Sequence, residues 1–305
     1  MAGGEMKAWS VVMLLTMVLG ACSNAGQIGP SLEFEPAPST PSAEPSALVT
    51  PAASNADPTV VEGLFDVGAY ELYMRCSGTG SPTVVYLHGS IPDPAFSGSS
   101  SALEIQDLLD ENYRMCVYDR ANIGRSDSVP GPLDGESSVA DLHALLQAAE
   151  IDPPYVLLPA SFGGPIADIY AATYPGEVVG MVQLDANPPG TLEAIDNAFF
   201  PAEERLQPDH WVGTNEEIDE LAVFAQARAL EASMPAIPVT YLAVPPDPSE
   251  DPDIAAAYRA LQQDFVDRFS PGWLIEVDVD HYMEPLIPER IAEEVRRLIV
   301  SIEQE

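Results

Sequence analysis

The residues best suited to chemistry lie at the junction between a predicted strand and a predicted helix. Leu158–Gly164 reads Leu-Pro-Ala-Ser-Phe-Gly-Gly, and Ser161 stands where the strand ends and the helix begins. A sharp turn at such a junction exposes a serine hydroxyl and directs the free amides of the helix towards it. The usual pattern is Gly-x-Ser-x-Gly, and Pro159 replaces the first Gly here. Ser161 is therefore a candidate nucleophile in an imperfect motif.

Four histidines are available as the base that a catalytic serine requires. The base takes the proton of the hydroxyl, and an acid orients the base and stabilises its charge. His143 falls within an amphipathic helix, and His210 lies in a segment without a clear strand. His88 belongs to a glycine-containing loop. His281 follows the last predicted strand and is the candidate base.

The elements that would hold these residues alternate between strand and helix after Thr59. Continuous apolar runs predict buried strands, and amphipathic spacing between them predicts crossover helices. We expect strands at 60–70, 71–75, 83–87, 114–118, 154–158, 178–184, 238–244 and 273–279, and helices at 101–110, 138–149, 165–174, 254–269 and 288–302. Residues 187–236 break this rhythm and predict a helical cap over the edge of the sheet.

Segments along the whole domain resemble the α/β-hydrolase superfamily. The matching segments are Tyr86–Gly89, Tyr118–Asp127, the turn around Ser161, and Asp280–His281. The resemblance covers about residues 60–305 and implies an α/β-hydrolase fold, with a mostly parallel central sheet, flanking helices and a short helical cap. In that family the second segment is structural, so Asp119 and Arg120 receive no catalytic role.

The acid of the triad has two candidates. In this family the nucleophile, acid and base follow in the order Ser, Asp, His, each on a loop after a strand. Asp247 follows the predicted strand 238–244 and is the favoured acid. Asp185 ends the strand 178–184 and is the alternative, because some hydrolases place the acid there.

Two backbone amides are candidates for the oxyanion hole. Acyl transfer needs donors to the oxygen that gains negative charge. Phe162, directly after the nucleophile, is placed to supply one. The loop His88-Gly89-Ser90, after the strand 83–87, is placed to supply the other from Ser90. The alternative interpretation of this loop is a simple turn.

The first part of the chain predicts export and lipid anchoring. Lys7 precedes an apolar run at 8–19, which is short for a membrane span of about 20 residues. Cys22 follows Leu-Gly-Ala and resembles a bacterial lipobox, so residues 1–21 are interpreted as a signal peptide and Cys22 as lipidated. Ordinary cleavage is the alternative. Residues 22–59, rich in Pro, Ala and Ser, predict a tether. We expect a lipid-anchored protein on the outer face of a bacterial cell membrane.

Cys76 and Cys116 are the remaining cysteines. Two cysteines in an exported protein often pair. The strand order implied by the hydrolase resemblance places the strand before Cys76 beside the strand that contains Cys116. The resemblance thus implies a disulfide between them. Two buried free thiols are the alternative.

The charge of the chain limits its partners. There are 48 acidic residues and 12 basic ones, for a formal net charge of −36. Such a surface repels nucleic acid and anionic lipid, so no nucleic-acid partner is expected. The sequence has no His-Glu-x-x-His, Cys-x-x-Cys, EF-hand or phosphate-loop pattern, so no metal or cofactor is predicted.

The predicted function is hydrolysis of a carboxylic ester, with an amide as the weaker candidate, through an acyl-Ser161 intermediate. The mostly apolar cap favours a small or medium hydrophobic substrate. Two alternatives remain. One is a catalytically inactive surface binding protein, for which Pro159 is the main argument. The other is an acyltransferase or perhydrolase that uses the same triad.

Overall fold

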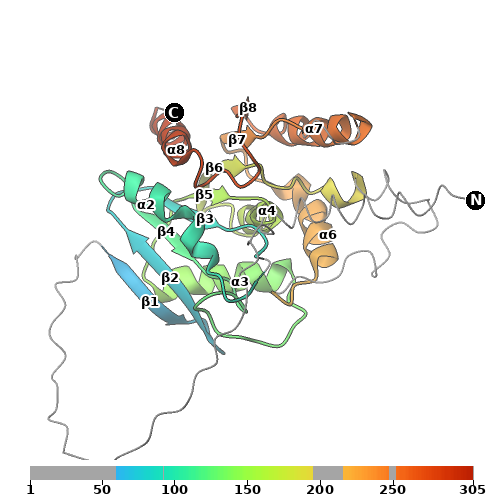
Figure 1. The fold of residues 1–305 in the computed structure, drawn as a ribbon. Coiled ribbons are helices and arrows are strands. Elements are labelled where there is room, and N and C mark those ends of the chain that lie inside the picture. Colours follow the sequence, from blue (N-terminus) through green and yellow to red (C-terminus); the bar gives the residue numbers. More distant parts are fainter. Residues whose placement is uncertain (1–59, 92, 195–215, 247–251, 305) are drawn as a thin grey trace, which may run out of the picture.

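The computed structural model describes residues 60–91, 93–194, 216–246 and 252–304 (Figure 1). Within them, strands form one sheet in the order β1-β2-β4-β3-β5-β6-β7-β8. β2 pairs antiparallel with β1 and with β4, and the pairs from β4 to β8 are parallel. The strands are β1 (Val61–Asp66), β2 (Glu71–Ser77), β3 (Thr83–Leu87), β4 (Met115–Tyr118), β5 (Tyr155–Pro159), β6 (Val178–Leu184), β7 (Val239–Ala243) and β8 (Gly272–Glu276).

Helices cover both faces of the sheet (Figure 1). α2 (Leu103–Leu109) and α8 (Pro288–Glu303) pack together on one face. The other face carries α3 (Gly135–Ala148), α4 (Gly163–Thr173), α6 (Glu220–Leu230) and α7 (Pro252–Val266). Short 3-10 helices lie at Gly98–Ala102 and Glu231–Ser233. This is the α/β-hydrolase architecture expected from the sequence.

β3 shows why a continuous apolar strand needs helices on both sides. Successive side chains of a strand point to opposite faces. Val85 and Leu87 belong to the core that α3 and α4 close, whereas Val84 and Tyr86 belong to the core that α2 and α8 close. All four side chains are fully buried. The strand is thus held in the middle of the domain, with its carboxyl end available to the site.

The boundaries of the helices differ in places from the predicted ones. α3 begins at Gly135, earlier than predicted, because Asp134 caps it. The Asp134 carboxylate accepts a hydrogen bond from the Ser137 amide at 2.8 Å, and the Ser137 hydroxyl accepts one from the Asp134 amide at 2.8 Å. This reciprocal capping box satisfies amides that the helix itself leaves without acceptors.

The predicted signal peptide and tether, with Cys22, fall outside the described residues. Of the predicted cap, 187–194 and 216–236 are described, and the latter stretch contains α6. No helix in the described parts of the chain has the length and apolar character required to cross a membrane.

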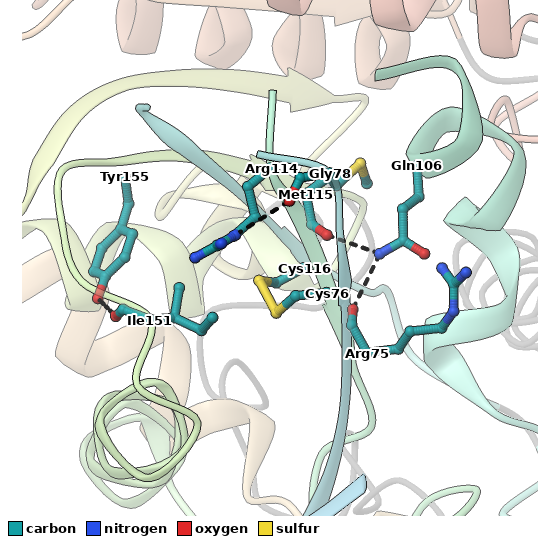
Figure 2. Close-up of a disulfide and its surroundings, with 9 residues drawn as sticks. All are labelled: Arg75, Cys76, Gly78, Gln106, Arg114, Met115, Cys116, Ile151 and Tyr155. Atoms are coloured by element: carbon teal, nitrogen blue, oxygen red, sulfur yellow. Dashed lines mark hydrogen bonds between the residues drawn. A yellow bond between two sulfur atoms is a disulfide. The ribbon is translucent and has the colours of Figure 1, made fainter. Parts of the chain in front are cut away.

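A disulfide joins β2 to β4 (Figure 2). Cys76 and Cys116 lie directly opposite each other in the antiparallel pair, with their Cα atoms 4.0 Å apart. Both side chains are fully buried. Beside the bond, Gln106 Nε2 donates to the carbonyls of Arg75 and Met115, at 3.0 and 2.8 Å, and so links the same two strands a second time. The structure contains the disulfide that the sequence implied.

Counting thiols tests this bond in the expressed protein. In a Cys22→Ala variant, only Cys76 and Cys116 remain, so the denatured protein should show no thiol before reduction and two afterwards. Replacing both cysteines by alanine should lower the free energy of unfolding by about 2–4 kcal/mol, because the unfolded chain regains the freedom that the cross-link removes. Two titratable thiols before reduction would instead show buried free cysteines.

Candidate active site

Ser161 occupies a tight turn between β5 and α4. Its φ angle is 48°, in the left-handed region that non-glycine residues rarely adopt. The turn is held from the neighbouring strand, because the Ser161 amide donates to the Leu184 carbonyl at 3.2 Å. The Asn187 amide donates to the Ser161 carbonyl at 2.9 Å. Backbone strain of this kind persists where the surrounding structure enforces it, and it is typical of catalytic turns.

The glycines after Ser161 are required by close backbone contacts. A Cβ atom on Gly163 would lie 2.2 Å from the Leu87 carbonyl oxygen, and one on Gly164 would lie 3.0 Å from the Asn187 carbonyl oxygen. Pro159, which replaces the usual glycine, is the last residue of β5 and lies opposite Leu87 of β3. The substitution therefore falls at the carboxyl end of the strand rather than in its interior.

His281 and Asp185 complete a hydrogen-bonded chain with Ser161. His281 Nε2 lies 3.0 Å from Ser161 Oγ, and His281 Nδ1 lies 2.6 Å from Asp185 Oδ2. A carboxylate can only accept, so Nδ1 carries the proton and Nε2 is the acceptor for the serine hydroxyl. Ser161 follows β5, Asp185 follows β6 and His281 lies between β8 and α8. Three loops at the carboxyl edge of the sheet thus bring the side chains together.

The acid in contact with His281 is Asp185, the alternative of the sequence analysis. Its second oxygen, Oδ1, accepts from Gln262 Nε2 at 3.1 Å and from the Val244 amide at 3.3 Å. These donors turn Oδ2 towards the imidazole. The favoured candidate, Asp247, lies outside the described residues. Among the described residues, the geometry supports Asp185 as the acid.

The pKa of His281 reflects two opposing effects. Burial lowers it, but the hydrogen bond and negative charge of Asp185 raise it, with further contributions from Glu284 and Asp280. The net result is a pKa above the ordinary histidine value. The imidazolium that forms when His281 takes a proton is therefore stabilised, as a general base requires.

The predicted oxyanion donors flank the nucleophile. Phe162 is the N-cap of α4, and amides at the first turn of a helix have no acceptor within it. Gly89 lies against Ser161, since a Cβ added to it would be 3.0 Å from the serine Cβ. The amide of Ser90 follows directly. The structure thus brings the 88–90 loop next to Ser161, which Phe162 follows directly in the chain.

A buried ion pair behind this loop was not identified from the sequence. Arg120 contacts Glu216 through two hydrogen bonds, Nε to Oε2 at 2.7 Å and Nη2 to Oε1 at 2.9 Å. Both residues are almost fully buried, at 3% and 0% exposure. The resemblance placed Arg120 in a structural segment, and no sequence signal pointed to Glu216, which is 96 residues away.

Glu220, at the start of α6, carries an unusual carboxyl group beside this pair. Its pKa is raised from 4.5 to about 7, mainly by burial and further by the nearby charge of Glu216, while the Arg120 charge acts in the opposite direction. Because the folded state holds the proton more tightly than the unfolded state, this carboxyl favours folding most below pH 4.5. That contribution is lost as the pH rises through 7.

Replacing Glu220 by glutamine should remove this pH dependence. Glutamine resembles the protonated carboxyl, so at pH 8 the variant should have a higher free energy of unfolding than the wild type, by on the order of 1–3 kcal/mol. Near pH 4 the two should be similar. Urea unfolding across this range measures the difference. Glu217→Gln, at an exposed position nearby, is the matched control and should show no such gain.

Other features of the described residues lie apart from the triad. An open cavity of about 530 Å³ is lined by Ala69, Tyr70, Asp127, Ser128, Val129, Pro130 and Leu133. None of the triad residues lines it. Within the described ranges, no group of three or more His, Cys, Asp or Glu side chains gathers as a metal site.

Comparisons with known proteins agree with this architecture. A family model described as alpha/beta hydrolase fold matches residues 82–246. A putative non-heme chloroperoxidase from Synechocystis sp. is 30% identical over 46% of this chain and 49% of its own. The match to this chain spans less than half the length of this relative and of two other curated relatives.

Solved structures with a similar fold include an esterase and a haloalkane dehalogenase. One is a thermophilic esterase from Thermogutta terrifontis, with a TM-score of 0.56 and 17% identity, over 79% of this chain and 98% of that one. The other is the haloalkane dehalogenase DbeA from Bradyrhizobium elkani, with a TM-score of 0.57 and 18% identity, over 80% and 99%. At these identities the likeness concerns the fold alone.

Proposed function

Because this chain belongs to the α/β-hydrolase family, we propose that it is a serine hydrolase that cleaves carboxylic esters through an acyl-Ser161 intermediate. One observation carries the proposal: Ser161, His281 and Asp185 form a continuous hydrogen-bonded chain in the order that proton transfer needs. Serine as nucleophile supports acyl chemistry, because dehalogenation in this fold uses an aspartate instead. An amide is the weaker candidate substrate.

The proposed reaction has two halves. Ser161 Oγ attacks the ester carbonyl carbon while its proton passes to His281 Nε2, and Asp185 stabilises the resulting imidazolium. The tetrahedral intermediate collapses, the C–O bond to the alcohol breaks, and the alcohol leaves with the proton from His281. A water molecule then attacks the acyl-serine with His281 as base. The carboxylic acid is released and the serine hydroxyl is restored.

The amides of Phe162 and Ser90 are the proposed donors to the oxyanion in both tetrahedral intermediates. Each such donor contributes about 10²–10³-fold to turnover in enzymes of this type. The substrate class rests on large apolar residues in the predicted cap, among them Phe199, Phe200 and Trp211, which favour small or medium hydrophobic acyl or alcohol groups.

Covalent labelling combined with an ester panel tests the proposal. A fluorophosphonate should label the wild-type protein at Ser161, and p-nitrophenyl esters of increasing acyl length should be hydrolysed with an optimum at short or medium length. Absence of both labelling and hydrolysis would favour an inactive binding protein on the same fold.

Perhydrolysis is a second candidate that a specific observation favours. The relative from Synechocystis bears the name of a non-heme chloroperoxidase. The same acyl-Ser161 could react with hydrogen peroxide in place of water, which would release a peracid and restore the serine. Comparing peracid formation with ester hydrolysis in the presence of peroxide distinguishes the two activities.

Lipid anchoring through Cys22 is proposed from the lipobox-like segment alone. Cys22→Ala should release the protein from the membrane fraction of the expressing bacterium, because the described residues contain no helix able to span a membrane. Fractionation followed by immunoblotting measures this. Persistent membrane association of the variant would indicate an uncleaved apolar helix at 8–19 instead.

A further inference from the structure

The loop that carries the proposed second oxyanion donor is held by its carbonyl groups. Arg120 Nη1 donates to the His88 carbonyl at 2.6 Å, and Arg120 Nη2 donates to the Gly89 carbonyl at 2.8 Å. In a trans peptide the carbonyl and the following N–H point in opposite directions. Fixing the Gly89 carbonyl on the guanidinium therefore fixes the Ser90 N–H in the opposite direction.

His88 supports the same peptide from within the loop. The Arg120 amide donates to His88 Nε2 at 3.3 Å, so Nδ1 carries the proton and donates to the Gly89 carbonyl at 2.8 Å. Burial lowers the pKa of His88 well below its ordinary value, with a further contribution from the Arg120 charge, which keeps the ring neutral. The Gly89 carbonyl thus receives two donors, and the Gly89–Ser90 peptide has little freedom to rotate.

Glu216 holds both Arg120 and the far side of the loop. Besides its two bonds to the guanidinium, its Oε1 accepts from the Ile91 amide at 3.0 Å. The Arg120 guanidinium also lies 5.7 Å from the centre of the Phe162 ring, the residue of the other proposed donor. One buried carboxylate is therefore connected, through a single arginine, to both sides of the oxyanion hole.

Glu216 comes from the cap segment rather than from the sheet. The residues after it dock onto the body of the domain, because the Leu133 amide donates to the Glu217 carbonyl at 2.7 Å and the Asp219 amide donates to the Leu133 carbonyl at 2.8 Å. The Asn122 side chain donates to the Glu216 carbonyl at 2.9 Å. The end of the cap is thus anchored at the point where its carboxylate meets the loop.

We propose that Glu216 and Arg120 are positioning residues that set the direction of the Ser90 amide and thereby control stabilisation of the oxyanion. This inference rests on the proposed serine hydrolase function. A contribution to folding stability is a weak explanation for the presence of this buried ion pair, because such pairs can often be replaced by apolar residues without loss of stability. Precise placement of an amide explains it well, because a bidentate carboxylate fixes the plane of the guanidinium.

Two variants and a matched control test the proposal. Glu216→Gln keeps the shape of the side chain but removes the charge that holds Arg120. The double variant Arg120→Met/Glu216→Leu replaces the pair by apolar side chains and leaves no unpaired charge. Glu293→Gln changes an exposed glutamate of α8, paired with Arg297, in the same way and should retain wild-type turnover.

The expected result is a loss in kcat with little change in KM. Both pair variants should lose about 10–100-fold in kcat, less than or equal to the effect of removing one oxyanion donor, while KM stays within about twofold. Their affinity for a trifluoromethyl ketone, which forms a tetrahedral adduct with serine, should fall by the same factor as kcat/KM. A purely structural role would lower the melting temperature without this parallel change.

The outcomes distinguish failure of the proposed hydrolase function from failure of the positioning role of Glu216 and Arg120. Wild-type protein that neither hydrolyses esters nor reacts with fluorophosphonate would overturn the proposed function, and this inference with it. An active wild type and folded pair variants with kcat within about twofold of it would overturn the inference alone. Failure of both pair variants to fold would assign the pair a structural role and overturn the inference as well.

Discussion

Replacing Ser161 by alanine should abolish ester hydrolysis and fluorophosphonate labelling while the fold stays intact. The substitution removes only the hydroxyl group. His281 Nε2, which lies 3.0 Å from Ser161 Oγ in the wild type, would then have no nucleophile to deprotonate. Knocking out the serine of a comparable triad lowers kcat by about 10⁶-fold, so a loss of at least about 10⁴-fold is expected here. Steady-state turnover and gel-based labelling measure it.

The matched control for this variant is Ser128→Ala, on an exposed side chain outside the triad. It should retain wild-type turnover. The circular dichroism spectrum and melting temperature of Ser161→Ala should equal those of the wild type. Alanine and serine both carry a Cβ atom, so the cost of the positive φ angle of 48° at this position is similar for the two residues. Undiminished turnover in Ser161→Ala would contradict the proposed mechanism.

Replacing Asp185 by asparagine should lower kcat by about 10⁴-fold, the effect seen for the corresponding change in other triads. The amide removes the negative charge that holds the Nδ1 proton of His281 and stabilises the imidazolium. The same loss should lower the pKa of His281, which Asp185 raises. Because His281 acts as a base only when neutral, the acidic limb of the kcat/KM profile should move to lower pH.

Asp247→Asn is the natural comparison, since it makes the same chemical change at the acid that the sequence favoured. It should leave kcat within a few-fold of the wild type. The opposite ranking of the two variants, with Asp247→Asn far more damaging, would return the role of the acid to Asp247.

Much of the fold could be predicted because its strands are long, buried and bounded by clear turn residues. Strand 83–87 and strand 178–184 were placed at their observed bounds, since an apolar run between polar loops leaves little freedom. The disulfide followed once the order of strands in the family was combined with the pairing of β2 and β4. Helix starts were less accurate, although Asp134 and Ser137 carried a readable capping signal.

The site was harder to predict where loops decide it. Asp185 and Asp247 both follow predicted strands, so their positions in the sequence do not show which of them contacts His281. Asp185 comes directly after β6, with φ 41°, so its position is tied to the strand beside the one that carries Ser161. The pairing of Arg120 with Glu216 was missed because charged residues are rarely buried, and the contact between them depends on tertiary packing alone.

The disulfide also determines how the domain responds to a mechanical load. A pull applied through residue 60 enters the sheet at β1, an edge strand whose hydrogen bonds to β2 can open in succession. At Cys76 the load crosses to Cys116 in β4, so the stretch between two cysteines separated by 40 residues carries none of it. That stretch would add roughly 130–140 Å of extended chain after reduction. The bond therefore limits how far the N-terminal end of the domain can be drawn out under tension.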